Sequence, residues 1–200
     1  MISRVFVDLD NTLLPFDTAL PVWRAILKCG LRPKLSRITF QHGSQSIAKS
    51  IMVSCFTELP LEHYRLFFHE LANKFMKSVD SSVRGWAESL LQDKSKIHIV
   101  TGSLLPLADG IAENLGWGQS VGTDVETKAN LLTGRLNGIS IKGSQKLEAI
   151  KRVFHLKNQD FRSCAAAGDS YSDRYLLQKC SVQYFPKQSS RRLIRYFSSS

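Results

Sequence analysis

Residues 4–12 of the chain read RVFVDLDNT, a short apolar run that ends in two aspartates separated by one residue. Residues 5–7 are typical of a strand covered on both faces of a parallel sheet, and ligands bind beyond the carboxyl ends of such strands. Because side chains alternate along a strand, Asp8 and Asp10 are expected on the same face. Two close carboxylates are costly to ionise together, so the pair predicts a site that holds a cation or uses both groups in a reaction.

Two further strand-like runs also end in polar residues. Residues 96–100 lead into Thr101, Gly102 and Ser103, and residues 164–167 lead into the sequence GDSYSD at 168–173. Between them, Lys146 stands near the start of an amphipathic stretch. The carboxyl ends of parallel strands meet at one edge of a sheet, so these groups are expected around the same crevice as the aspartates.

These motifs, in this order, resemble those of the haloacid dehalogenase superfamily of phosphohydrolases. Asp8-Leu9-Asp10-Asn11-Thr12 is similar to the family's first motif, DxDx(T/V), and Thr101 to its second. Lys146 falls on the third motif, and residues 168–173 fall on the acidic fourth motif, GDSxxD. The resemblance covers the core from end to end and implies an α/β fold, with a Rossmann-like core around a parallel sheet.

The likeness extends to the subfamily that contains phosphoserine phosphatase. The TGRL segment at 133–136 and the lysine-led helix at Lys146 are similar to features of that group. The resemblance implies a small helical cap of the C1 type inserted after the first strand. We therefore predict a phosphatase core over 1–13 and 86–200 and a helical cap over 14–85, with an extended hairpin at the edge over 125–141.

The residue types suit phosphoryl transfer. A carboxylate that attacks phosphorus forms an aspartyl phosphate, and Asp8 is the predicted nucleophile. Asp10 is the predicted general acid and base. The Thr101 hydroxyl and the Gly102 amide, expected at the start of a helix, and the Lys146 ammonium are expected to bind the substrate phosphate.

A hard cation with oxygen ligands is implied by the same carboxylates. The predicted ion is Mg²⁺, bridging Asp8, the backbone carbonyl of Asp10 and Asp169. Asp173 is expected to support this metal site directly or through water.

Each of these residues also has a structural explanation. Thr101 and Ser103, or Asp169 and Ser170, could cap the helices that follow. Lys142 is a neighbour that could replace Lys146 as the phosphate ligand. Asp17 stands where phosphoserine phosphatase has a substrate-binding Glu, which makes phosphoserine a less certain substrate, and it could instead be a helix N-cap.

The basic excess is not explained by the core. Lys and Arg number 27 against 17 Asp and Glu, giving +10, and residues 18–57 contain no acidic residue. This insertion interleaves cations with apolar residues, which fits a solvated helix face, steering of a small anionic phosphate ester, or peripheral contact with an anionic membrane. A partial likeness to phosphatidylglycerophosphatase C keeps a lipid phosphate ester as an alternative substrate.

A non-catalytic anion- or nucleic-acid-binding module is the alternative from another class, since the basic tail over 187–195 suits phosphate backbones. Nucleic acid is nevertheless not the expected partner, because a binding module has no need of the complete catalytic set. The four cysteines show no metal-ligand spacing, no apolar stretch is long enough to suggest a membrane span, and no signal-peptide pattern is present. We therefore expect a cytoplasmic enzyme, and the sequence leaves its oligomeric state open.

Overall fold

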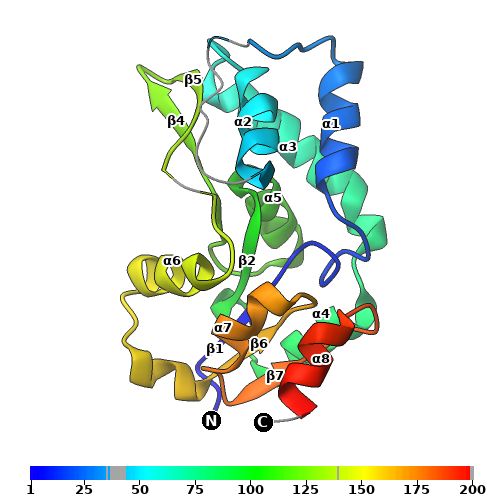
Figure 1. Cartoon of the computed structure of the whole chain (residues 1–200), viewed down its shortest axis with the longest axis vertical. Coiled ribbons are helices and arrows are strands. Elements are labelled where there is room, and N and C mark those ends of the chain that lie inside the picture. Colours follow the sequence, from blue (N-terminus) through cyan, green and yellow to red (C-terminus); the bar gives the residue numbers. More distant parts are fainter. Residues whose placement is uncertain (35, 37–43, 139, 199–200) are drawn as a thin grey trace.

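A five-stranded parallel sheet forms the centre of the molecule (Figure 1). The computed structural model describes residues 1–34, 36, 44–138 and 140–198. The strand order is β3-β2-β1-β6-β7. The strands are β1 (Arg4–Val7), β2 (Ile97–Leu104), β3 (Val121–Thr123), β6 (Cys164–Ala167) and β7 (Val182–Tyr184). The predicted α/β fold with a parallel sheet is confirmed, and β1 lies in the middle of it.

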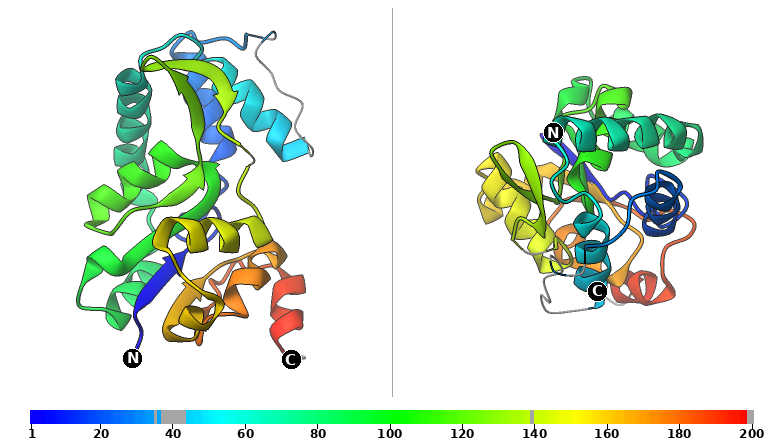
Figure 2. Two further views of the ribbon diagram at one scale, coloured as in Figure 1. Left: turned by 90° about the vertical axis from the view of Figure 1, so that its left-hand side faces the viewer. Right: turned by 90° about the horizontal axis from the view of Figure 1, so that it is seen from above.

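Alternation along β1 divides the core between the two faces of the sheet. Val5 and Val7 join an apolar cluster with helices α4 (Ser81–Leu90) and α5 (Leu105–Leu115). Phe6 joins a second cluster with the helices on the opposite face (Figure 2). These are α6 (Ser144–Phe154), α7 (Arg174–Leu177) and α8 (Arg191–Ser198). All three side chains are fully buried, as a strand covered on both faces requires.

A helical insertion follows β1, as predicted, and lies above the carboxyl ends of the strands in Figure 1. Its helices are α1 (Ala19–Lys28), α2 (Ser44–Ser54) and α3 (Leu61–Phe75). Short 3-10 turns complete the chain at Met76–Ser78, Lys94–Lys96, Asn158–Ser163 and Tyr171–Asp173. The strand ends that carry the predicted polar residues therefore face these helices (Figure 1).

The predicted hairpin exists, but it does not extend the sheet. Strands β4 (Val125–Lys128) and β5 (Leu131–Leu136) form a separate antiparallel pair that packs against α2. The Glu58 amide donates to the Leu132 carbonyl at 2.8 Å, and the Leu132 amide donates to the Leu59 carbonyl at 2.9 Å. The hairpin thus pairs with the helical insertion. The position that we predicted for it, at the edge, is wrong because its free backbone groups find these partners instead of β3.

Two details near the C-terminus also differ from the sequence analysis. The segment after Ser170, where we expected a helix that Asp169 or Ser170 could cap, is a 3-10 turn followed by the single turn α7. The basic tail forms α8, whose Leu193 is fully buried in the core beside α6 and α7. Within the described ranges, no helix has both the length and the apolar character needed to cross a membrane.

His98 is a buried polar residue of β2 that belongs to the core and not to the crevice. Its Nδ1 lies 3.0 Å from the Gln119 carbonyl, and its Nε2 lies 3.0 Å from Arg4 Nη1. A carbonyl only accepts and a guanidinium only donates, so the ring is neutral with its proton on Nδ1. Burial lowers the pKa of His98 to about 4, and the nearby Arg4 charge acts in the same direction.

This histidine predicts acid sensitivity of the fold. The neutral ring is favoured in the folded state, so its stabilising contribution is complete above the unfolded pKa of about 6.5. It is lost as the pH falls toward 4, at no more than about 1.4 kcal/mol per pH unit. Urea unfolding between pH 7 and pH 4.5 should show this slope, and His98→Gln should reduce it. The exposed His63→Gln is the control, and an equal slope in all three proteins would contradict the assignment.

Candidate active site

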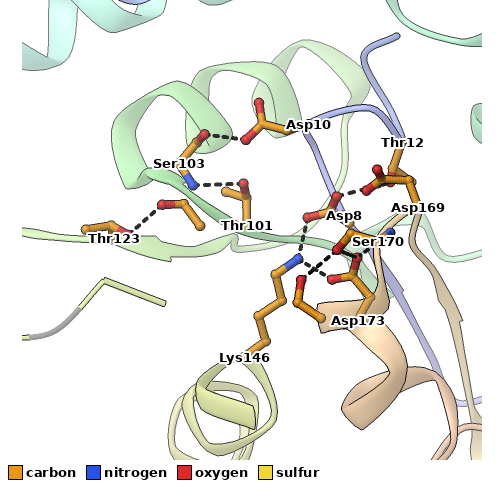
Figure 3. A network of polar contacts seen from close by, with 12 residues as sticks. Asp8, Asp10, Thr12, Thr101, Ser103, Thr123, Lys146, Asp169, Ser170 and Asp173 are labelled. Carbon is orange, nitrogen blue, oxygen red and sulfur yellow. Dashed lines mark hydrogen bonds and ion pairs between the residues drawn. The ribbon is translucent and has the colours of Figure 1, made fainter. Parts of the chain in front are cut away.

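Asp8, Lys146 and Asp173 form one buried ion network at the carboxyl end of β1 (Figure 3). Lys146 Nζ donates to Asp8 Oδ1 and, at 2.6 Å, to Asp173 Oδ1. The Asp8 side chain is 9% exposed and the other two are less so. Lys146 is in the first turn of α6, and therefore supplies one positive charge to two buried carboxylates from β1 and the turn after β6.

The turn that carries Asp173 is fixed by its own hydrogen bonds. Asp173 Oδ2 accepts from the Ser170 hydroxyl at 2.7 Å and from the Ser170 amide at 3.1 Å. A Cβ on Gly168 would lie 2.7 Å from the Asp173 Cβ, so only glycine permits this close approach. Glycine, serine and aspartate of the GDSxxD motif thus have a structural reason to occur at this spacing.

Asp169 completes a cluster of three carboxylates. Oxygen atoms of Asp8, Asp169 and Asp173 all lie within 4.8 Å of one another. Thr12 Oγ1 donates to Asp8 Oδ2 at 3.0 Å and is 3.4 Å from Asp169 Oδ1, which links the first and fourth motifs. Three converging carboxylates fit a hard divalent cation, which takes oxygen ligands.

The electrostatics of the cluster also favour a cation. Burial raises the pKa of Asp8 to about 8, despite the attraction of Lys146, and repulsion from Asp173 and Asp10 adds to the effect. Burial and the Asp173 charge raise the pKa of Asp169 to about 6. Burial would also raise the pKa of Asp173, but Lys146 and the Ser170 hydrogen bonds lower it below its usual value. Lys146 alone does not fully compensate this negative charge, and a bound cation would.

Asp10 is held apart from the ion network by different partners. Its Oδ2 accepts from the Ser103 hydroxyl at 2.5 Å, and its Oδ1 accepts from the Thr18 amide at 2.8 Å. The Thr18 and Ser103 hydroxyls lie 2.9 Å apart. These bonds connect the carboxyl end of β1 to the bulge of β2 and to the start of α1, so Asp10 lies where the core meets the helical insertion.

Thr101 and Gly102 lie in a bulge of β2, and not at the start of a helix as predicted. Pairing with β3 shifts between Val100 and Leu104, so that β2 has two more residues than β3 over this interval. The extra residues are displaced from the ladder, which re-aims their side chains. Thr123 Oγ1 donates to the Gly102 carbonyl at 2.7 Å and fixes the bulge, while α5 begins only at Leu105.

Lys49 is a cation that the helical insertion brings to the same crevice. Its Nζ donates to the Ser140 hydroxyl at 2.6 Å, and a Cβ on Gly102 would lie 3.4 Å from it. Burial lowers the pKa of Lys49 to about 8; Asp10 and Asp17 oppose this shift, and Lys142 and Lys146 increase it. Nothing in the sequence distinguishes Lys49 from the other cations of residues 18–57, because the orientation of α2 relative to β2 has no short-range signal.

Asp17 is not the N-cap of α1, which is Thr18, but it makes a hydrogen bond at the start of that helix. Its Oδ1 accepts from the Ala19 amide at 2.8 Å, in the first turn of α1, and the residue is exposed. Asp17 also lies near enough to Lys49 to influence its pKa. A role in substrate binding stays a prediction.

The structure brings the predicted catalytic and metal-site residues to one place. Around Asp8 lie the other predicted groups from four separate segments, namely Asp10, Thr101, Gly102, Lys146, Asp169 and Asp173. Ser103 and Thr123 are additional residues of the site. Ser103 was expected at this edge without a catalytic role, whereas Thr123 follows no recognisable motif.

A parallel sheet with a buried aspartate, a lysine bonded to it and a carboxylate cluster at its carboxyl edge is the arrangement expected of a hydrolase with an aspartate nucleophile. The haloacid dehalogenase-like hydrolase model matches residues 5–178. The chain belongs to this family, as its motifs predicted.

Two curated relatives agree with the family assignment. A phosphoserine phosphatase of Archaeoglobus fulgidus is 26% identical over 182 residues, which cover 89% of this chain and 50% of that protein. The chain therefore spans half the length of this curated relative. A phosphoserine phosphatase of Mycobacterium tuberculosis is 31% identical over 78 residues, covering 39% of this chain and 25% of its own length.

Solved structures confirm the fold. A protein of unknown function from Bordetella pertussis superimposes with a TM-score of 0.79 at 19% identity, covering 100% of this chain and 96% of its own. A phosphoserine phosphatase in its apo form gives a TM-score of 0.59 at 16% identity, covering 98% and 99%. The predicted core with a helical cap after the first strand is thus an architecture shared with phosphoserine phosphatase.

The ion network predicts a large loss of stability when the positive charge of Lys146 is removed. Lys146→Met leaves Asp8 and Asp173 buried without their shared partner, so we expect the free energy of unfolding in EDTA to fall by about 3 kcal/mol. Urea titration monitored by circular dichroism would measure this. The double variant Asp8→Asn/Lys146→Met removes one charge of each sign and should be more stable than Lys146→Met alone. Equal stability of the two variants would show that the pair is not coupled.

Proposed function

We propose that the chain is a Mg²⁺-dependent phosphomonoesterase that acts through an aspartyl phosphate on a small phosphorylated metabolite. The observation that carries the proposal is the division of labour between two carboxylates. Asp8 is fixed by Lys146, beside the metal-site candidates. Asp10, two residues further along the chain, is fixed by the Ser103 hydroxyl and the Thr18 amide. One carboxylate is thus arranged as a nucleophile and the other as a proton carrier.

In the first half of the reaction, an Asp8 carboxylate oxygen attacks the substrate phosphorus. The bond between phosphorus and the leaving alkoxide breaks, and Asp10 donates its proton to that alkoxide. The Ser103 hydroxyl and the Thr18 amide keep the Asp10 carboxyl in place for this transfer. The products of the step are a free alcohol and an aspartyl phosphate on Asp8.

In the second half, Asp10 removes a proton from water, which attacks the aspartyl phosphate. The new bond to phosphorus replaces the bond to Asp8, releasing inorganic phosphate and restoring the carboxylate. Negative charge on the transferring group is bound by Lys146, by the Gly102 amide and by Thr101. Because Thr101 Oγ1 accepts from the Ser103 amide at 3.0 Å, its own hydrogen remains for a phosphate oxygen.

Asp8, Asp169 and Asp173 are the side chains that would hold Mg²⁺, and the Asp10 carbonyl, beyond the end of β1, would be a further ligand. When bound, the ion would neutralise charge on the carboxylates and on the phosphate. The three converging carboxylates and the raised pKa values of Asp8 and Asp169 support this assignment.

The substrate is proposed to be a phosphate ester that carries a second anionic group. Lys49 supports this, since it is a cation on the cap side of the crevice that neither the nucleophile nor the metal site requires. The phosphoserine phosphatase relatives agree with a carboxylate as that group. A lipid phosphate ester is the second candidate, favoured by the basic and apolar helices of the cap.

A cytoplasmic location is part of the proposal and has the support of the unpaired cysteines: Cys29, Cys55, Cys164 and Cys180. The alternative of a non-catalytic binding module has less support, because the chain belongs to a hydrolase family and retains every residue that the reaction needs. Nucleic acid is not part of the proposed function.

Asp8→Asn should abolish turnover and leave the fold intact, because it keeps the volume and removes the attacking charge. The measurement is Mg²⁺-dependent phosphate release from a panel of phosphoserine, phosphoglycolate, glycerol phosphate, phosphoethanolamine, nucleotides and phosphatidylglycerophosphate. Release by the unchanged protein in EDTA would contradict metal dependence, and release by Asp8→Asn would contradict the nucleophile.

Lys49→Met should raise KM for esters with a second anionic group by about tenfold, which corresponds to the loss of one charged hydrogen bond. The KM for glycerol phosphate, which lacks that group, should change little. Lys49→Arg is the matched control, since it keeps the charge. A similar loss for every ester would instead place Lys49 on the transferring phosphate.

A further inference from the structure

The outer face of α1 combines exposed apolar and basic side chains. Val22 and Ile26 point into the core, and the opposite side of the helix carries Leu20, Arg24 and Leu27. Leu20 is 55% exposed and Leu27 is 39% exposed. They are seven residues apart with Arg24 between them, so all three lie along one stripe of the helix.

Such a pair of leucines is unusual in the part of the chain that the structure describes. Six large apolar side chains are strongly exposed there, and two of the six belong to this one stripe. Figure 1 shows α1 at the outer edge of the cap, with one side turned away from the other helices. Large apolar side chains that gather on an exposed helix face indicate contact with another surface.

The charged residues within α1 are all positive. Lys28 and Arg32 are exposed beside Leu27, and Arg32 Nη1 donates to the Leu31 carbonyl at 3.0 Å at the end of the helix. No acidic residue occurs in residues 18–57. The partner of this face must therefore be both anionic and able to accept leucine side chains.

We propose that the outer face of α1, formed by Leu20, Arg24, Leu27 and Lys28, docks on an anionic lipid surface. The leucines enter the boundary between headgroups and acyl chains, and the cations bind lipid phosphates. A second copy of the chain is a poorer partner, because a symmetric contact would bring the cations of both copies together. Nucleic acid would satisfy the cations but give the leucines nothing to contact.

Vesicle co-sedimentation tests this docking without any measurement of turnover. The unchanged chain should bind vesicles containing phosphatidylglycerol at 50 mM salt and bind phosphatidylcholine vesicles much more weakly. Arg24→Glu/Lys28→Glu should reduce the partition coefficient by more than about 25-fold, at about fivefold for each cation removed. Leu20→Ser/Leu27→Ser should reduce it by about tenfold at the same salt concentration.

The matched control is Leu66→Ser/Lys74→Glu on α3, which removes an exposed leucine and an exposed lysine from a different helix. Leu66 is 57% exposed, so the apolar loss is comparable. This control should bind as the unchanged protein does, and all variants should keep their phosphate release from a soluble ester.

Three results would overturn the proposal. The first is the absence of binding to anionic vesicles by the unchanged chain. The second is a loss of vesicle binding that is not specific to α1, seen either as an equal loss in the α3 control or as a loss only in a further variant, Arg191→Glu in α8. The third is binding that falls with charge reversal but is unaffected by the leucine changes, which would indicate a general polyanion site. Failure here would leave the proposed phosphatase activity untouched, because that activity is measured on soluble esters.

Discussion

The compensation of two buried carboxylates by one lysine is the constraint on which the rest of the site depends. Asp8 and Asp173 come from segments 165 residues apart, and the buried carboxylates of both accept from one partner, Lys146, whose charge opposes the cost of their burial. The need to bring Lys146 to both carboxylates determines where α6 begins and where the turn after β6 bends. It also explains why Gly168, next to Asp173, must lack a side chain. The catalytic arrangement and the packing of the core therefore have the same physical origin.

The sheet topology explains how so many charges come together. β1 is central and parallel to both β2 and β6, so the three polar motifs that follow these strands emerge at one edge. Successive side chains of β1 pack against the helices on opposite faces of the sheet. Polar residues can therefore face a crevice only at the end of this strand. Function is thus confined to that edge by the burial of both faces.

The sequence was sufficient for the sheet and for the residues at its edge, because short apolar runs and polar strand ends are local signals. Val5–Val7, the Asp8–Asp10 pair and the GDSxxD turn are found in the structure as expected. The place of the hairpin over 125–136 could not be predicted in this way, since its partners at residues 58 and 59 are distant in sequence. The bulge at 101–103 and the approach of Lys49 depend on pairing register and helix orientation, which residue spacing does not encode.

The attachment of the β4–β5 hairpin to the helical insertion has a mechanical consequence. A cap inserted in a single loop joins its core by two stretches of backbone, and it can open like a clamp about that pair. Here the chain passes between the two layers four times: after β1, before α4, after β3 and before α6. The last of these connections leads directly into the helix that carries Lys146. Displacement of the cap must therefore pull on the helix that holds the central charge, and the four tethers make the layer above the crevice stiffer than a simple lid.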